Sequence, residues 1–367
     1  KCISLYERFK AAGVKFIFLT GSVPAVSIYA LMARDHIPGI PMGCTGELCF
    51  YEPEVPYLIA GAEFMPQLSG GYLAYYIKRM WDKPGKPKVA IMCADVGSRR
   101  VYELPEAHMY EMVEALGGEL LPIEFVSLSP IDLKIVFSRL VDKGVNCILY
   151  DHFSDAANRV FIHNAVDLKL WEKDICLMVQ TIDPKVTLAE PDIWDRYTDM
   201  GGTILAGGGG FAGAQETYDK YAINPQFWGL ELTYDLCNKY RGKLPEQMGG
   251  SFYSFLGAQI FEMVSKTTLE KYGYEGLTGE TLRESLFSLG PIETGVGPPM
   301  VIDYDTLPLS VQISALSRIK GGHLLFEPEV HPWKEGTLVY GKTRFNPIKL
   351  APEWSRYVFR DYMEPIR

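Results

Sequence analysis

The chain has 367 residues, of which 47% are hydrophobic, and a formal net charge of −9. The length suggests two domains, and the apolar content excludes a disordered chain because it allows buried cores to form. Acidic and basic residues are mixed along the whole length, which argues against a nucleic-acid partner, and no apolar run is long enough for a membrane span.

The first residues after Lys1, CISLYERFKAAG, are helix-like, so we expect upstream residues and any export signal to precede this sequence. Short apolar runs then alternate with polar loops and amphipathic stretches. Their lengths and β-branched content are typical of strands buried on both faces, and the strand–helix alternation predicts parallel α/β sheets. The predicted strands lie at 16–19, 39–42, 89–93, 121–126, 147–150, 175–179 and 202–206.

Amphipathic stretches between these strands predict helices. One covers 101–116, where apolar positions and His108 recur every four residues, and a second covers 131–141, with Asp132 as its N-terminal cap or first-turn acid. The apolar stripe of the second consists of Ile131, Leu133, Ile135, Val136, Leu140 and Val141.

The pattern loosens in the second half of the chain. The sequence there predicts loops at 225–228 and 244–250, helices at 252–272 and 281–289, a Gly/Pro-rich connector at 290–308, and strands at 311–319 and 323–328.

Seven cysteines are too few for a scaffold built on disulfides. Cys93, Cys147 and Cys176 lie in strand-like runs and are expected as small buried hydrophobic residues, like Cys237 in a helix-like stretch. Cys44 and Cys49 share one short loop, where free thiols are favoured over a local disulfide. With no CxxC or HExxH motif and six scattered histidines, we expect no metal site.

Two segments carry a resemblance to a known family. Residues 11–48 read as a strand, a Gly-Ser loop, a helix, and a second strand ending in a small-small-Thr loop, and residues 87–150 read as a strand–helix–strand–helix–strand run with Asp132 before its second helix. In this order the chain resembles the type I periplasmic solute-binding proteins, in particular the branched-chain-amino-acid-binding family of ABC importers. The resemblance covers residues 10 to 325. The family's opening strand, first helix and second strand are absent, and the tail after Gly341 is additional.

The resemblance implies an α/β fold of periplasmic-binding-protein type I. Two Rossmann-like lobes of parallel sheet, flanked by helices, would be joined by three crossing strands near 61, 207 and 300, where glycines can absorb a hinge rotation. We also expect the sheet of the first lobe to be incomplete, or completed by another segment. The expected lobes are 1–60 plus 207–297 and 62–206 plus 298–340, with 341–367 as a C-terminal extension.

Ligand contacts of the first lobe are expected where its strands end, since ligands of open α/β sheets bind at the carboxyl ends of strands. Gly21 and Ser22 follow a strand and precede a helix, where backbone N–H groups and a hydroxyl would cradle a carboxylate, although a simple helix cap has the same pattern. The resemblance adds Gly43, Cys44 and Thr45, which would offer a carbonyl to a ligand amine and a hydroxyl to its carboxylate. A turn hydroxyl is the alternative for Thr45.

In the second lobe the resemblance places an aromatic wall at Tyr150 or Phe153, with core packing as the alternative for each. Gln180 stands where the amino-acid binders have an acid that holds the ligand ammonium. Because Gln carries no charge, we expect a carboxylic acid without an α-amino group, unless Asp151 or Asp183 supplies the missing carboxylate.

These observations predict a protein that catalyses no reaction and needs no cofactor. It would be the periplasmic substrate-binding component of an ABC importer, with a small-molecule ligand and a membrane permease as partners. A ligand-sensing domain of a receptor or regulator is the alternative. Gly208, Gly210 and Gly213 satisfy GxGxxG, but no strand ending in an acid follows at the distance that a dinucleotide enzyme requires.

Overall fold

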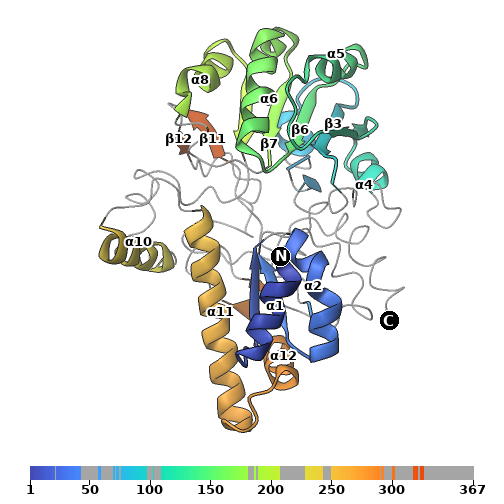
Figure 1. The fold of residues 1–367 in the computed structure, drawn as a ribbon. Helices are drawn as coiled ribbons and strands as arrows, with labels where there is room; N and C mark the ends of the chain where they lie inside the picture. The colour runs from blue at the N-terminus through green and yellow to red at the C-terminus, as the bar shows by residue number, and fades with distance from the viewer. Residues whose placement is uncertain are drawn as a thin grey trace. The chain divides into compact units, whose positions relative to one another are not determined.

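The computed structural model describes residues 1–20, 22–42, 57–58, 69–70, 72–73, 76–96, 102, 109–180, 186, 189–206, 228–242, 249–289, 291–292, 300–301, 317–320 and 323–325. They form two compact units (Figure 1). The described residues of the first unit lie within Lys1–Met65 and Phe252–Gln312, and those of the second lie within Pro66–Ser251 and Ile313–Val358. The predicted crossings near 61 and 207, and the predicted extension 341–367, lie outside the described residues, so the lobe boundaries stay a prediction.

The first unit has a small parallel sheet between two pairs of helices. Its strands are β1 (Ile17–Thr20) and β2 (Gly39–Met42), and its helices are α1 (Cys2–Ala11), α2 (Ser22–Asp35), α12 (Gly279–Ser288) and, from Phe252 on, α11 (Gly249–Tyr272). Side chains alternate along β1 because successive residues of a strand point to opposite faces. Ile17 and Leu19 pack with residues of α1 and α2, whereas Phe16 and Phe18 pack with residues of α11 and α12.

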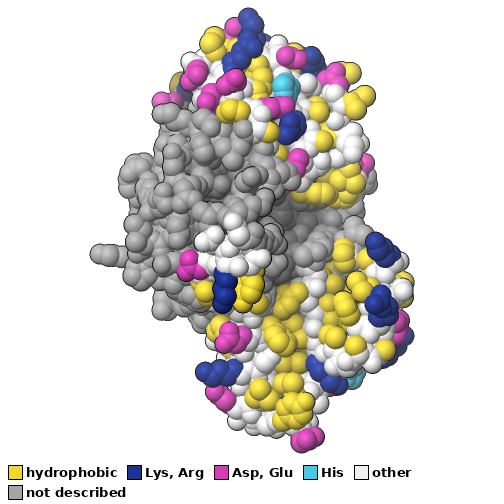
Figure 2. All heavy atoms as spheres, turned by 60° about the vertical axis from the view of Figure 1, so that its left-hand side comes forward, with side chains coloured by type: hydrophobic (Ala, Val, Ile, Leu, Met, Phe, Trp, Pro, Cys, Tyr) yellow, Lys and Arg dark blue, Asp and Glu magenta, His cyan; other side chains and the backbone are white. Residues whose placement is uncertain are grey.

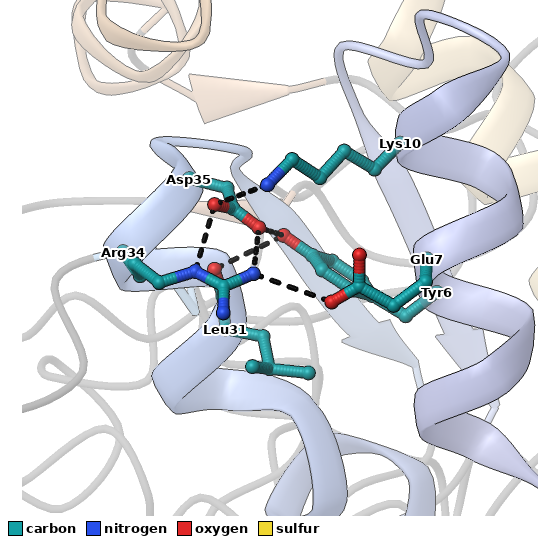
Figure 3. Close-up of polar contacts among 6 residues, drawn as sticks. All are labelled: Tyr6, Glu7, Lys10, Leu31, Arg34 and Asp35. Atoms are coloured by element: carbon teal, nitrogen blue, oxygen red, sulfur yellow. Dashed lines mark hydrogen bonds and ion pairs between the residues drawn. The ribbon is translucent and has the colours of Figure 1, made fainter.

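One carboxylate fastens α1 to α2 (Figure 3). Asp35 accepts hydrogen bonds from Arg34 at 2.7 and 2.9 Å, from Lys10 Nζ at 2.7 Å and from the Tyr6 hydroxyl at 3.1 Å. The Arg34 guanidinium, with Lys10 and Tyr6, holds the pKa of the Asp35 carboxyl well below its usual range. The contact therefore keeps its charge and joins the C-terminal end of α2 to the middle of α1.

The second unit is built on an eight-stranded sheet in the order β12-β11-β8-β7-β6-β3-β4, with β5 also paired to β3. The strands β8, β7, β6, β3, β4 and β5 all pair in parallel. At the β8 edge, β11 pairs antiparallel with β8, and β12 pairs antiparallel with β11. The parallel strands confirm the predicted α/β class. Their bounds are β3 (Lys88–Ala94), β4 (Glu119–Leu120), β5 (Glu124–Val126), β6 (Cys147–Asp151), β7 (Cys176–Val179) and β8 (Thr203–Ala206), and those of the additions are β11 (Ser317–Lys320) and β12 (His323–Leu325).

One face of this sheet is covered by α5 (Lys134–Asp142), α6 (Asp155–Asp167) and α8 (Pro191–Asp199). Buried residues of α5, α6 and α8 share one core with Ile148 and Tyr150 of β6 and Leu177 of β7. Tyr72, Leu73, Tyr76 and Ile77 are also buried, in the segment that precedes β3. Further helices are α4 (Met109–Ala115) and α10 (Trp228–Arg241), with single turns η2 (Tyr76–Met80) and η5 (Leu170–Lys173).

Several predicted boundaries were wrong. Of the strand expected at 121–126, only Glu124–Val126 is strand, as β5, and the short strand β4 ends just before the expected range, at Leu120. The connector expected at 290–308 contains an antiparallel ladder of β9 (Pro291–Ile292) and β10 (Met300–Val301). Trp228 and Gly249, both expected in loops, begin α10 and α11.

The surface carries charges of both signs. Figure 2 shows acidic and basic side chains interspersed on the face that it presents, and apolar side chains such as Phe261 and Leu269 of α11 are partly exposed. Among the helices that the structure describes, none is long and apolar enough to cross a membrane.

Candidate functional site

A candidate site lies at the carboxyl edge of the parallel strands in the second unit. β6 ends at Asp151, and Gln180 follows the last residue of β7. The Gln180 backbone N–H donates to the Tyr150 carbonyl oxygen at 2.9 Å and so continues the pairing of the two strands. Because both strands run in the same direction, their last side chains are brought to one edge of the sheet.

Four buried polar residues form a cluster at this edge. They are Ser69, Tyr102, Asp151 and Gln180, called here the polar cluster, and each is at most 1% exposed. Ser69 precedes β3 and Tyr102 follows it, while Asp151 and Gln180 lie at the ends of β6 and β7. The cluster thus joins segments that are as far as 111 residues apart in the sequence.

Short hydrogen bonds connect the polar cluster. The Ser69 hydroxyl donates to Gln180 Oε1 at 2.6 Å and lies 2.7 Å from the Tyr102 hydroxyl. The Tyr102 hydroxyl lies 2.7 Å from Asp151 Oδ2, to which it donates, and 3.3 Å from Gln180 Oε1. Burying these groups without partners would be costly, so the network fixes their positions. The network also orients the side-chain carboxamide of Gln180, since its oxygen faces Ser69 and its N–H groups therefore point away from Ser69.

His152 holds the loop that follows β6. Its Nδ1 accepts from the Ser154 backbone N–H at 3.1 Å, and its Nε2 lies 3.2 Å from the Ser127 carbonyl oxygen. A ring that accepts at Nδ1 and faces a carbonyl at Nε2 is neutral, with its proton on Nε2. The histidine is buried, so it ties the loops after β5 and β6 together beneath the surface.

The two aromatic candidates of this unit have different surroundings. Tyr150 is buried, and its ring stacks on Phe161 of α6 with 4.3 Å between centroids. Since Tyr150 and Asp151 are consecutive in β6, they point to opposite faces of the sheet. Phe153 is 52% exposed, beside His152 at 5.6 Å between ring centroids. Of the two rings, only that of Phe153 reaches the surface.

Most candidates of the first unit cannot be compared with the structure. Gly21, Gly43, Cys44 and Thr45 lie outside the described residues. Ser22 is the first residue of α2, as the helix-start pattern predicted, but its side chain is not described. The loop of Gly208, Gly210 and Gly213 also lies outside the described part.

Sequence reasoning missed Ser69, Tyr102 and His152, and it gave Asp151 only as an alternative to another acid. Asp151 and His152 directly follow an apolar strand, which is a usable signal. Ser69 lies in no predicted element, and Tyr102 lies in the predicted helix 101–116 but outside the stripe that recurs every four residues. Within the described part of the chain, no group of three or more His, Cys, Asp or Glu side chains is arranged to hold a metal ion.

Comparison with known proteins identifies the fold. No protein-family model and no curated protein sequence matches the chain. A solute-binding protein of an ABC transporter from Rhodopseudomonas palustris HaA2, solved in complex with p-hydroxybenzoic acid, is 18% identical and aligns over 95% of this chain and 84% of its own with a TM-score of 0.65. A branched-chain amino acid ABC transporter protein from Thermus thermophilus with bound valine is 15% identical, covering 89% and 81% of the two chains with a TM-score of 0.64.

An extracellular ligand-binding receptor from Rhodopseudomonas palustris HaA2 is 11% identical and covers 87% of this chain and 83% of its own, with a TM-score of 0.66. The chain therefore has the periplasmic-binding-protein type I fold, which confirms the fold predicted from the sequence.

Proposed function

We propose that this chain is the substrate-binding component of an ABC importer and that it captures a small organic ligand as its two lobes close. The observation that carries the proposal is the polar cluster at the carboxyl edge of β6 and β7, in a fold shared with solute-binding proteins. Ligands of open α/β sheets bind at this edge. The role requires no cofactor and no reaction, and it requires export to the periplasm and docking on a membrane permease.

The preferred ligand in this proposal is a carboxylic acid without an α-amino group. Gln180 offers hydrogen bonds but no negative charge, so an ammonium group buried against it would lack a counter-charge. Asp151 is the carboxylate of the polar cluster, but it is buried below the surface and accepts from Tyr102. Two solute-binding proteins of similar fold were solved with p-hydroxybenzoic acid and 3,4-dihydroxybenzoic acid, which fits this preference, whereas a third was solved with valine.

The sequence predicts the remaining ligand contacts of the proposed site. Gly21 and Ser22, with Gly43, Cys44 and Thr45, would hold the ligand carboxylate with hydroxyl and backbone N–H groups. The apolar part of the ligand would contact Phe153, whose exposed ring can meet it directly. Tyr150, the other aromatic candidate, is buried against Phe161 of α6 and supports the strand end from the opposite face of the sheet.

Calorimetry on wild type and Gln180→Glu tests the ligand class. We expect wild type to bind 4-hydroxybenzoate or 4-methylpentanoate more tightly than leucine. Gln180→Glu restores a negative charge and should move the ratio of the two affinities toward leucine by about tenfold, equivalent to about 1.4 kcal/mol. The exposed amide Asn238 of α10 provides the control, because Asn238→Asp adds a charge to the same unit at an exposed position and should leave the ratio unchanged.

The possible outcomes separate the class of ligand from the function. Tight binding of leucine together with no binding of the deaminated analogue would contradict the charge argument for Gln180. Absence of binding across a full panel of amino acids and organic acids would contradict the solute-binding function itself.

A further inference from the structure

Two cysteines lie side by side at the beginning of β6 and β7. Cys147 and Cys176 are the first residues of these parallel strands and are direct partners in their register. Residues paired in this way project from the same face of the sheet. Both are free thiols in the structure, and the neighbouring Cys176 adds to the rise in the pKa of Cys147 that burial causes.

The face that carries this pair is the face of the polar cluster. Along β6, Cys147, Leu149 and Asp151 point to it, because side chains alternate along a strand. Their partners along β7 are Cys176 and Met178, followed by Gln180. The thiol pair is thus separated from the polar cluster by one apolar layer, Leu149 and Met178, and lies at the opposite end of the strands.

The thiols are closed off from solvent. Cys147 is fully buried and Cys176 nearly so. Tyr76 covers this end of the strands, where its hydroxyl donates to the Asn146 carbonyl oxygen at 3.1 Å. Burial raises the pKa of the Cys147 thiol well above its usual range. Thiolate, the reactive form, is therefore scarce in the folded protein, and a soluble oxidant has no direct access.

The spacing of the strands suits a covalent bond. Neighbouring strands lie about 4.7–4.9 Å apart, and the Cα atoms of disulfide-bonded cysteines lie about 4.4–6.8 Å apart. We propose that Cys147 and Cys176 are a redox pair, which closes to a cross-strand disulfide when the chain folds in an oxidising compartment. The bond would fasten the two central strands whose far ends carry the polar cluster.

The reaction is a thiol–disulfide exchange with a disulfide oxidant such as oxidised glutathione. One cysteine thiolate attacks the oxidant, forms a mixed disulfide and releases one glutathione thiolate. The second cysteine thiolate then attacks the protein sulfur of the mixed disulfide and releases the second glutathione thiolate. The two cysteines together lose two electrons and two protons, and the oxidant is reduced to two thiols. Because both thiols are buried in the native fold, this exchange occurs before the sheet is complete.

Peptide mapping after oxidative refolding tests the proposal. The full chain is unfolded with reductant, refolded with oxidised glutathione, alkylated, and digested with trypsin without reduction. Residues 144–159 and 174–185 are expected tryptic peptides, and each contains a single cysteine, Cys147 or Cys176. We expect the two peptides to be recovered linked, to separate on reduction, and to be recovered unlinked from Cys147→Ser and Cys176→Ser.

A parallel sample distinguishes bond formation during folding from oxidation of the native protein. Reduced native protein exposed to the same oxidant should retain both thiols, which alkylate only after denaturation. The urea midpoint of refolded wild type should fall when reductant is added, whereas the midpoint of Cys176→Ser should fall less. Recovery of both peptides as separate alkylated species after oxidative refolding, or linkage of either cysteine to another one, would overturn the proposal.

Discussion

At the scale of single residues, hydrogen bonds hold each member of the polar cluster in place. Two hydroxyl groups lie between a carboxylate and a carboxamide, and the network positions Gln180 through Ser69 and Tyr102 rather than through its own strand alone. A buried network of this kind is costly when one member is lost, because the others are left without partners.

Removal of one hydroxyl tests that constraint. Tyr102→Phe deletes the donor to Asp151 and the contact at 2.7 Å with Ser69. We expect the free energy of unfolding of the second unit to fall by about 1–3 kcal/mol, measured by urea denaturation. Tyr274→Phe, at an exposed tyrosine, is the matched control and should change stability by less than about 0.5 kcal/mol. Equal effects of the two substitutions would show that the network contributes nothing.

The same residues show how far the sequence predicts the site. Gln180 and Asp151 were accessible to prediction because they directly follow apolar runs that form strands. Ser69 and Tyr102 were not, because local periodicity predicts elements and not which loop folds over which strand end. The contact between Ser69 and Gln180 spans 111 residues, and only the tertiary fold creates it.

At the scale of elements, α5 shows where sequence patterns fail. The predicted stripe included Ile131 and Ile135, but they are 95% and 78% exposed, whereas Leu133, Phe137 and Leu140 are buried. Buried positions recur at intervals of four and three residues, as expected for one face of a helix. The N-cap of α5 is Leu133 and its first turn holds no acidic residue, so the role predicted for Asp132 as a cap or first-turn acid was wrong. Asp132 precedes the cap and accepts from the Lys134 backbone N–H at 2.7 Å. The exposed Ile131 and Ile135 made the apolar stripe in the sequence point away from the face that is buried.

This orientation predicts that two substitutions on the same helix change the free energy of unfolding by very different amounts. Phe137→Ala removes a buried ring that lies 5.3 Å from Phe161 between centroids, and should lower the free energy of unfolding by about 3–5 kcal/mol. Ile135→Ala should change it by no more than about 0.5 kcal/mol. Chemical denaturation of both variants measures these changes. A large loss of unfolding free energy in Ile135→Ala would mean that Ile135 belongs to the buried face, as the sequence pattern predicted.

At the scale of the whole molecule, the two units have separate cores. One core gathers Phe16 and Ile40 with residues of α11 and α12, and another gathers the strands β6 and β7 with α5, α6 and α8. Chains with two such cores need not unfold in one step. A ligand that contacts both units binds only when both are folded, so it stabilises each of them by linkage.

Calorimetric scans with and without ligand test this coupling. Without ligand we expect two unfolding transitions, or one that is broader than a two-state transition. An organic acid at a concentration of about one hundred times its Kd should stabilise the folded chain by about 2.7 kcal/mol. Because the ligand is lost as soon as either unit unfolds, the two transitions should move up together and merge. If the ligand raised one transition and left the other in place, it would be bound by a single unit, and the proposed closure of two lobes on the ligand would be wrong.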